Sequence, residues 1–581
     1  MAVSNKNLNV TLVGKGKATL RPTNYVTTGG EASIYRLNHD IVKVFTDPHK
    51  MSADKMTEKV GILSKLKHKF IINPLGIVED DKHNPIGYYM TFAEGEPLSR
   101  VFTTAFRQRD GFNDQDSIQL VHNMREVPIF AHANGAVLVD ANELNWLMRR
   151  DPQPEPRICD VDSWQIGTRW PARVIMPSIR DFHSNVFDER SDWFSWGIVT
   201  FQIFTGIHPY KGRHDGYKMT ELERRMRDNV SVFNKDVHLN AAVRDFNCIP
   251  GPLLSWYEKV FEHGERTIPP SPLDKTQTTT IIRQMRVATT ASGALVFEII
   301  LPAAGNPVVR VYPCGVALRA NGTLVELQGK IPLRMITFNG KPCSPAAEIV
   351  RTGRGYLIAD QGNFKYITAE MEKDLTLTAN TYGVLRSGNR MFAITDSGLT
   401  ELNLMELNSF GPDPNPVLAL GQTWQILRNS TEWFQGVGVQ NSLGAKYLII
   451  PFGDKAVSFL RTPELDDVTV VNARAGYRFA SVVALDKNGD YQKLEFCLDA
   501  DHGKYTLWQG PTDTPEINLA ILPSGVCATI VQDGELAIFV PANGKVNKVA
   551  DKKIQTDMLL GTWGDAVVYV QNGELSRVKM K

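Results

Sequence analysis

Residues 132–145 read His132-Ala-Asn-Gly-Ala-Val-Leu-Val-Asp140-Ala-Asn-Glu-Leu-Asn145, and a second acidic turn, Asp160-Val-Asp162-Ser, follows fifteen residues later. This order suits phosphoryl transfer, in which one carboxylate meets the accepting hydroxyl while an amide and a second carboxylate hold the metal ion that bridges the phosphates. An Asp and an Asn at this spacing also occur together by chance in many chains. The pattern is therefore informative only if phosphate-binding residues lie upstream.

A suitable upstream pattern lies at residues 25–45. We expect three strands there, with a small-residue turn at Gly29-Gly30 and a lysine, Lys43, between two valines on the third strand. A glycine turn lets backbone amides approach phosphates, and a lysine on the third strand neutralises their charge. The alternative is a plain β-hairpin with a surface lysine.

A helix is expected from Asp54 to Leu66, because apolar residues recur there at helical spacing. Glu58 lies in this helix, fifteen residues after Lys43, and is the expected ion-pair partner that positions the lysine. The alternative is that Glu58 is one of several solvated carboxylates on the helix surface.

With these segments, roughly the first 270 residues resemble the protein kinase superfamily, and within it the divergent bacterial and phage kinase-like proteins. The resemblance is strongest at Ser191-Asp192-Trp-Phe-Ser-Trp-Gly and extends to Arg266 in Gly-Glu-Arg-Thr. It implies a bilobal α+β fold, with an N-lobe over about 20–93 and a C-lobe over about 94–270. It also implies that Asp192 ties the central helix of the C-lobe to the catalytic loop, and that Arg266 is a structural arginine.

The resemblance further implies that the protein is a protein serine/threonine kinase that uses ATP and Mg²⁺. Asp140 would orient the accepting hydroxyl and take its proton. The phosphate contacts would come from Gly29, Gly30 and Lys43, and the metal contacts from Asn145 and Asp160.

The chain departs from the kinase pattern in several places, and two of them concern short catalytic motifs. The usual His-Arg-Asp is Leu138-Val139-Asp140, and the usual Asp-Phe-Gly is Asp160-Val161-Asp162. Losing that glycine restricts the turn. These departures leave three alternatives open: a pseudokinase scaffold, a structural component such as a part of a phage particle, and a small-molecule phosphotransferase.

The second half of the chain has a different organisation. Hairpin-type turns, each followed by a half-buried strand, recur at Gly322, Gly362, Gly398, Gly489, Gly534 and Gly573. Their spacings are 40, 36, 91, 45 and 39 residues, and Gly444 divides the longest into 46 and 45. Seven all-β units of about 40 residues predict a β-propeller over 293–581, joined by a linker at 271–292. The segment near 294–301 is expected to complete the last unit, and an array of β-sandwiches is the alternative.

Composition sets the remaining limits. The 581 residues need at least two domains, and 43% hydrophobic and 22% charged residues are ordinary for a globular protein. A net charge of +1 and the lack of a long apolar stretch predict neither nucleic acid nor membrane as a partner. Six scattered cysteines indicate a reducing compartment. We expect a cytoplasmic protein, of a bacterium or an infected host cell, with virion association left open, and a protein partner on the propeller. Substrate and oligomeric state stay unpredicted.

Overall fold

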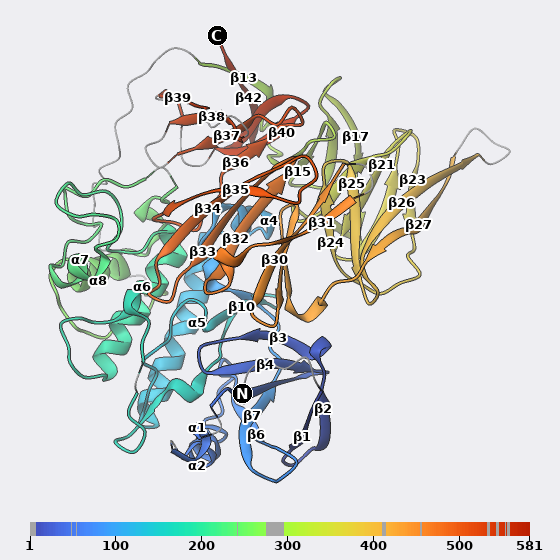
Figure 1. Ribbon diagram of the computed structural model, residues 1–581. Coiled ribbons are helices and arrows are strands. Elements are labelled where there is room, and N and C mark those ends of the chain that lie inside the picture. Colours follow the sequence, from blue (N-terminus) through green and yellow to red (C-terminus); the bar gives the residue numbers. More distant parts are fainter. Residues whose placement is uncertain are drawn as a thin grey trace.

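Figure 1 shows the protein as a computed structural model. The structure describes the following residues: 7–47, 49–53, 55–172, 174–240, 242–274, 295–408, 414–453, 456–531, 535–541, 545–551, 553–554 and 558–581. The linker expected at 271–292 and the turn expected at Gly534 lie largely or wholly outside these residues.

The fold class expected from the sequence, a bilobal α+β kinase-like fold followed by a seven-bladed propeller, is wrong. About 44% of the chain is strand and about 18% is helix, and no bilobal α+β pattern is evident. The described residues instead form eleven separate antiparallel sheets. The expectation relied on the order of short motifs. Four of the helices that form are only four to six residues long, so strands dominate. These short helices are α1 (Lys50–Ala53), α3 (Leu98–Val101), α4 (Thr104–Arg109) and α7 (Leu222–Arg227).

The largest sheet, at the bottom of Figure 1, has seven strands in the order β2-β1-β6-β7-β5-β4-β3. Its strands are β1 (Leu8–Leu12), β2 (Gly16–Leu20), β3 (Tyr25–Thr28), β4 (Ala32–Leu37), β5 (Asp40–Phe45), β6 (Pro74–Glu79) and β7 (Pro85–Thr91). The three strands expected over residues 25–45 are thus present, and Lys43 lies on β5 opposite Ile34 of β4 and Tyr88 of β7. The expected helix is shorter than predicted: α2 (Met56–Leu63) follows Lys55, whose backbone is left-handed.

The longer helices pack against one another. They are α5 (Asp114–Ala133), α6 (Glu189–Thr205) and α8 (Gly251–Phe261). Asp188 caps α6 by accepting the backbone N–H groups of residues 190 and 191, and Gly206 ends it with a φ of 78°. All side chains of α6 from Ser191 onward are buried, so α6 is the centre of the largest hydrophobic core.

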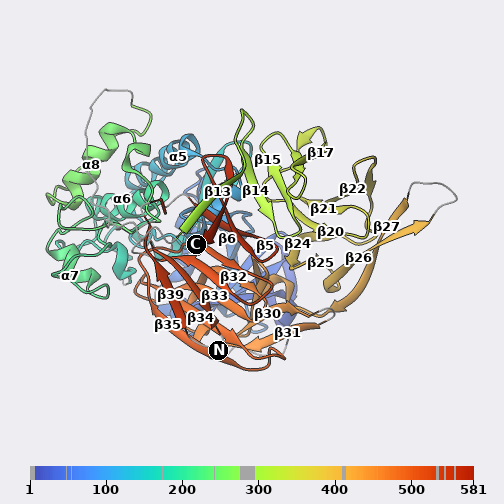
Figure 2. The same cartoon turned by 90° about the horizontal axis from the view of Figure 1, so that it is seen from above.

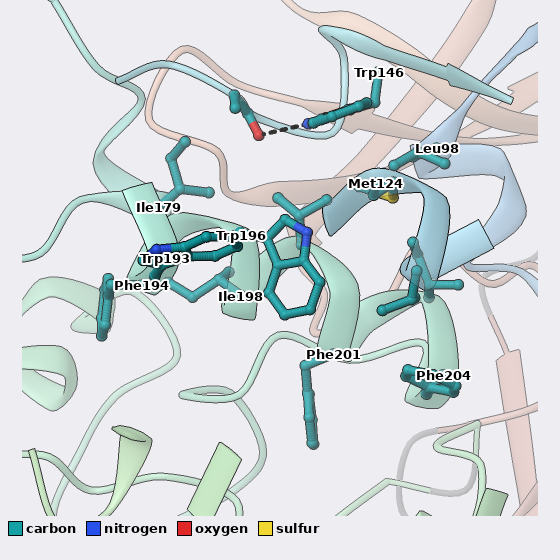
Figure 3. Packing of buried hydrophobic residues seen from close by; sticks show 14 of the residues in the cluster. Leu98, Met124, Trp146, Ile179, Trp193, Phe194, Trp196, Ile198, Phe201 and Phe204 are labelled. Carbon is teal, nitrogen blue, oxygen red and sulfur yellow. Dashed lines mark hydrogen bonds between the residues drawn. The ribbon is translucent and has the colours of Figure 1, made fainter. Parts of the chain in front are cut away.

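Figure 3 shows this core from close by. Trp193 and Trp196 meet edge to face, with ring centroids 5.8 Å apart, and Phe201 packs further along the same helix. Fully burying one such aromatic side chain contributes about 1.5–3 kcal/mol. The Trp146 indole donates to the carbonyl oxygen of Ala141 at 3.1 Å, which joins this core to the segment that carries Asp140 and Asn145.

Three small sheets stand apart from the larger ones. β8 (Glu96–Pro97), β10 (Trp146–Arg150) and β11 (Pro154–Ile158) form one of them. β9 (Ala136–Val137) pairs with β12 (Gln165–Ile166), and β18 (Thr337–Phe338) pairs with β19 (Lys341–Pro342). The first two sheets hold the ends of the loops that carry the candidate site residues.

Residues 295–581, called here the C-terminal β region, contribute seven four-stranded antiparallel sheets among the described residues. Each sheet has one edge strand that comes early in its unit: β14 (Val308–Tyr312), β20 (Glu348–Arg351), β24 (Thr381–Ser387), β28 (Thr431–Phe434), β32 (Thr469–Gly476), β36 (Leu519–Ile521) and β40 (Leu559–Trp563). Figure 2 shows this region, in yellow to red, lying beside the helices.

Six of these sheets consist of consecutive strands, and the seventh joins two distant parts of the chain. It contains β40, β41 (Ala566–Gln571), β42 (Glu574–Met580) and β13 (Leu295–Leu301). Leu295 pairs with Met580, so the pairing expected for the segment near 294–301 is present. Within the described ranges, the chain has no helix with the length and apolar character needed to cross a membrane.

Candidate functional site

A cavity of about 660 Å³ lies between the seven-stranded sheet and the segment of residues 160–174. Five of the residues selected from the sequence line it: Gly29, Gly30, Lys43, Asp140 and Asp160. Two do not line it, namely Glu58 and Asn145. The cavity lies within the size range of sites that take small organic ligands.

Lys43 is the centre of a buried charge cluster. Its side chain is 8% exposed, and its Nζ contacts Asp160 Oδ1 and lies 2.9 and 3.0 Å from the two carboxylate oxygens of Asp162. The hydroxyl of Tyr88 donates to Asp162 Oδ1 at 2.5 Å. Lys59 Nζ donates to the backbone oxygen of Asp162 at 2.5 Å. Asp162 is therefore held from three sides.

The pKa values of the two carboxylates of this cluster are shifted in opposite directions. Burial, reinforced by the neighbouring Asp162 carboxylate, raises the pKa of Asp160 to about 6. Burial also opposes ionisation of Asp162, but Lys43 and the Tyr88 hydroxyl outweigh it and lower the Asp162 pKa to about 2. Asp162 is thus the fixed counter-charge of Lys43. Asp160, with 39% of its side chain exposed, is the carboxylate available to a ligand.

Glu58 is not the partner of Lys43, which corrects the sequence-based expectation. It forms an ion pair with Arg169, and the two side chains are 53% and 54% exposed. The partners of Lys43 are Asp160 and Asp162, and the buried helix residue facing the cluster is Lys59, next to Glu58. Sequence reasoning missed Asp162, Lys59 and Tyr88. The second carboxylate of the Asp-Val-Asp turn was the signal available for Asp162.

Asp140 lies at the cavity wall with its carboxylate already hydrogen-bonded. Oδ1 accepts the backbone N–H of Met176 at 2.9 Å and the side-chain amide of Asn142 at 3.0 Å. Burial raises the Asp140 pKa above its usual range, and these two donors oppose that rise. Asn145 donates from Nδ2 to the backbone oxygen of Asp140 at 2.7 Å, which holds the loop closed.

Asp192 fixes the segment that leads into Asp140. It accepts the backbone N–H groups of Leu138 at 2.7 Å and Val139 at 2.8 Å, and its carboxylate lies 2.8 Å from His132 Nε2. Val139 has a φ of 63°, a left-handed conformation that these bonds stabilise. Arg266 pairs with Asp181 at 2.6 and 2.8 Å. Both residues therefore tie segments together.

The turn at Gly29-Gly30 borders open space. The Gly29 N–H donates to the Ala32 oxygen at 2.9 Å, which closes the turn. A Cβ added at either glycine would meet no atom within 4 Å. The turn therefore leaves its backbone accessible to a ligand in the cavity.

The oxygen donors in and near the cavity fit a magnesium ion whose remaining coordination positions are filled by the bound ligand. Asp160 supplies a carboxylate in the cavity lining, and Asn145, which lies outside that lining, has an amide oxygen that receives no hydrogen bond from the described residues. In the part of the chain that the structure describes, no group of three or more His, Cys, Asp or Glu residues could hold a metal by itself. Mg²⁺ commonly takes one or two carboxylates and fills its other positions with phosphate oxygens and water.

The C-terminal β region covers the face next to Asp140. The backbone N–H of Ser178, two residues after Met176, donates to the Asn488 oxygen at 3.0 Å, and Lys211 pairs with Asp490 at 3.0 Å. Tyr491 contacts the buried Glu143 at 3.3 Å. The hairpin turn of residues 486–490 thus lies against the segment that follows Met176.

His208 supports the same segment and gives a prediction on pH. Its Nε2–H donates to the Ser178 oxygen at 2.8 Å, and its Nδ1 accepts the Tyr210 N–H at 3.1 Å, which requires the neutral ring. Burial, with Lys211 and Arg225 nearby, lowers the His208 pKa to about 3. As the pH falls, the unfolded chain therefore protonates His208 before the folded protein does. The contribution of His208 to the free energy of unfolding should be constant above pH 6.5 and fall as the pH drops toward 3.

The expected loss at pH 4.5 is about 2–3 kcal/mol relative to pH 7. The measurement is the free energy of unfolding of wild type and His208→Gln between pH 7 and 4.5. Glutamine can donate and accept but does not titrate, so the variant should lack this part of the pH dependence. Equal pH dependence in the two proteins would contradict the assignment.

Comparison with known proteins adds no family assignment: no family model matches the chain, and no curated protein matches it significantly.

Proposed function

We propose that the 660 Å³ cavity binds Mg-ATP and that the protein transfers a phosphoryl group to a hydroxyl, with a serine or threonine side chain of a protein as the acceptor. The observation that carries the proposal is the buried Lys43–Asp160–Asp162 cluster in the same cavity as Asp140. A buried lysine with a fixed counter-charge, Asp162, lies next to a partly exposed carboxylate, Asp160. This arrangement is suited to a polyphosphate and its metal ion.

Each side chain would have a distinct role. Lys43 would neutralise phosphate oxygens, and the turn at Gly29-Gly30 would offer the backbone N–H of Gly30, since that of Gly29 already donates to Ala32. Asp160 and Asn145 would hold Mg²⁺, which when bound neutralises charge on the phosphates. Asp140 would orient the acceptor hydroxyl and take its proton, a role that its raised pKa favours.

The C-terminal β region covers the face next to Asp140, and this favours a second candidate function, phosphoryl transfer to a small molecule. The turn of residues 486–490 packs on Ser178, so a long acceptor would compete with it for space. A small alcohol would reach Asp140 from within the cavity without displacing this turn.

The test uses the full chain with Mg-ATP. We expect Mg²⁺-dependent nucleotide binding that raises the unfolding midpoint, since ligand at 100 times its Kd stabilises the state that binds it by about 2.7 kcal/mol. Asp140→Asn should keep this shift and lose transfer of the γ-phosphate. Phosphorylation of proteins, or of small alcohols only, separates the two acceptor classes. If the wild-type protein binds Mg-ATP but transfers no phosphate, it is a nucleotide-binding scaffold, and both proposed enzyme activities are rejected.

The proposal includes a cytoplasmic setting and a protein partner on the C-terminal β region, with no role for nucleic acid. All six cysteines are free thiols, which supports a reducing compartment.

A further inference from the structure

A second cavity, of about 740 Å³, lies where the seven four-stranded sheets meet. Every sheet contributes to its wall from the edge strand named above. The contributing residues include Arg310 of β14, Glu348 of β20, Leu385 of β24, Trp433 of β28, Arg474 of β32, Ile521 of β36 and Thr562 of β40. Because many strands build it, the wall is rigid and its polar groups are fixed relative to one another.

Two arginines in the wall share a single carboxylate. Arg310 contacts Glu348 Oε1 at 2.7 Å, and Arg386 contacts Glu348 Oε2 at 2.7 Å. All three side chains are less than one-fifth exposed. Burial opposes ionisation of Glu348, but the two guanidinium groups outweigh it and lower the Glu348 pKa. The group of three keeps one net positive charge.

Arg474 adds a second positive charge that forms no ion pair among the described residues, although the Glu348 carboxylate favours its charged form. Its side chain is partly buried and makes no hydrogen bond or ion pair with the described residues. Burial, together with Arg386 and Arg310, lowers the Arg474 pKa to about 10, so the group remains charged at neutral pH. Leaving a cation partly buried without a partner is costly, and an anion in the cavity would remove that cost.

Apolar and aromatic side chains border the same space. Trp433 and Phe434 precede Gln435, whose backbone forms an isolated β-bridge with the backbone of Arg474. Tyr382 and Tyr477 lie on other parts of the wall. Two uncompensated guanidinium charges match a dianion, and guanidinium groups bind phosphate through paired hydrogen bonds. Aromatic walls suit an organic group attached to that phosphate.

We propose that this cavity binds a small organic phosphate, with its phosphate on Arg474 and the organic part against Trp433 and Phe434. This site is separate from the cavity that contains Lys43, and it does not depend on the function proposed there.

The test is calorimetric titration of the full chain with phenyl phosphate and with inorganic phosphate. Phenyl phosphate should bind one molecule per chain, and inorganic phosphate should bind the same site more weakly. Arg474→Met should weaken binding roughly 10- to 100-fold, because charge-assisted hydrogen bonds are lost. It should also leave the unfolding midpoint of the free protein unchanged or higher, because a poorly solvated charge is removed.

Two further variants make the result specific. Arg354→Met removes an exposed arginine of the same region outside the cavity and should bind phenyl phosphate like wild type. Glu348→Gln should tighten binding, since it removes the carboxylate that balances the charges of Arg310 and Arg386. The proposal is overturned if phenyl phosphate does not bind, if it binds no more tightly than inorganic phosphate, or if Arg474→Met binds it as wild type does. Binding that Lys43→Met abolishes and Arg474→Met preserves would belong to the other cavity and would also overturn it.

Discussion

Replacing Asp160 by asparagine should abolish Mg²⁺-dependent nucleotide binding and phosphoryl transfer. The substitution keeps the shape of the side chain and removes the carboxylate of the cluster that lines the cavity and is 39% exposed. Changes that only affect the partners of a metal ligand cost 10- to 100-fold in affinity or activity, so loss of the ligand should cost on the order of 100-fold or more.

Loss of binding by Asp160→Asn should not come from unfolding. Burial and Asp162 already oppose ionisation of Asp160, so a neutral side chain should leave the unfolding midpoint of the free protein unchanged or slightly raised. The measurement is the unfolding midpoint and the rate of phosphate transfer, each with and without Mg-ATP. A variant that binds Mg-ATP as tightly as wild type would refute the assignment of Asp160 to the metal.

Glu58→Gln is the matched control for this experiment. Glu58 is also a carboxylate and is adjacent in sequence to Lys59, which lines the cavity. Its side chain, however, pairs with Arg169 at the surface. Exposed ion pairs contribute about 0–1 kcal/mol, so the variant should keep its stability, nucleotide binding and activity close to wild type. A large loss in Glu58→Gln would indicate that Glu58 reaches Lys43 when nucleotide binds.

Replacing Gly489 by alanine should separate the C-terminal β region from the segment beside Asp140. Gly489 has a φ of +84°, and a Cβ there would lie 1.9 Å from Ser178 Oγ and 2.5 Å from Ser178 Cβ. The left-handed backbone and the overlap together should lower the free energy of unfolding by about 2–5 kcal/mol. The measurement is denaturant unfolding, together with hydrogen exchange of the Ser178 N–H, which should lose protection.

Gly564→Ala controls for the backbone effect alone. Gly564 also lies in a hairpin turn of the C-terminal β region with positive φ, but a Cβ there would meet no atom within 4 Å. This variant should lose only about 1–2 kcal/mol and keep Ser178 protected. If both variants lose the same stability, the contact between Gly489 and Ser178 does not hold the two parts together.

Local signals in the sequence were sufficient for the turns and for several site residues. The glycines of the repeated turns that the structure describes all have positive φ, because hairpin turns demand a conformation that glycine adopts without strain: Gly322, Gly362, Gly398, Gly444, Gly489 and Gly573. Lys43 lies on the expected strand, and Asp192 holds the expected loop. The strand follows from a pattern only a few residues long, and the role of Asp192 was implied by the resemblance.

The fold class failed because it required more than local patterns. The order of motifs suggested lobes, but how far each helix extends depends on packing, and four of the helices end after one or two turns. Helix formation in proteins depends largely on tertiary packing of an apolar face. The sequence did not reveal where that packing would be absent.

The sequence by itself determined which chemical groups are present and their order: Lys43 on a strand, Asp140 and Asn145 in one loop, and two aspartates in the next turn. Only the tertiary structure decided which of them meet. Lys43 and Asp162 are 119 residues apart, and their pairing, in place of Glu58, depends on how the sheet approaches the second turn. The cover over Asp140 and the arginine cavity likewise arise from distant segments, because charge and shape complementarity between such segments exists only once the chain has folded.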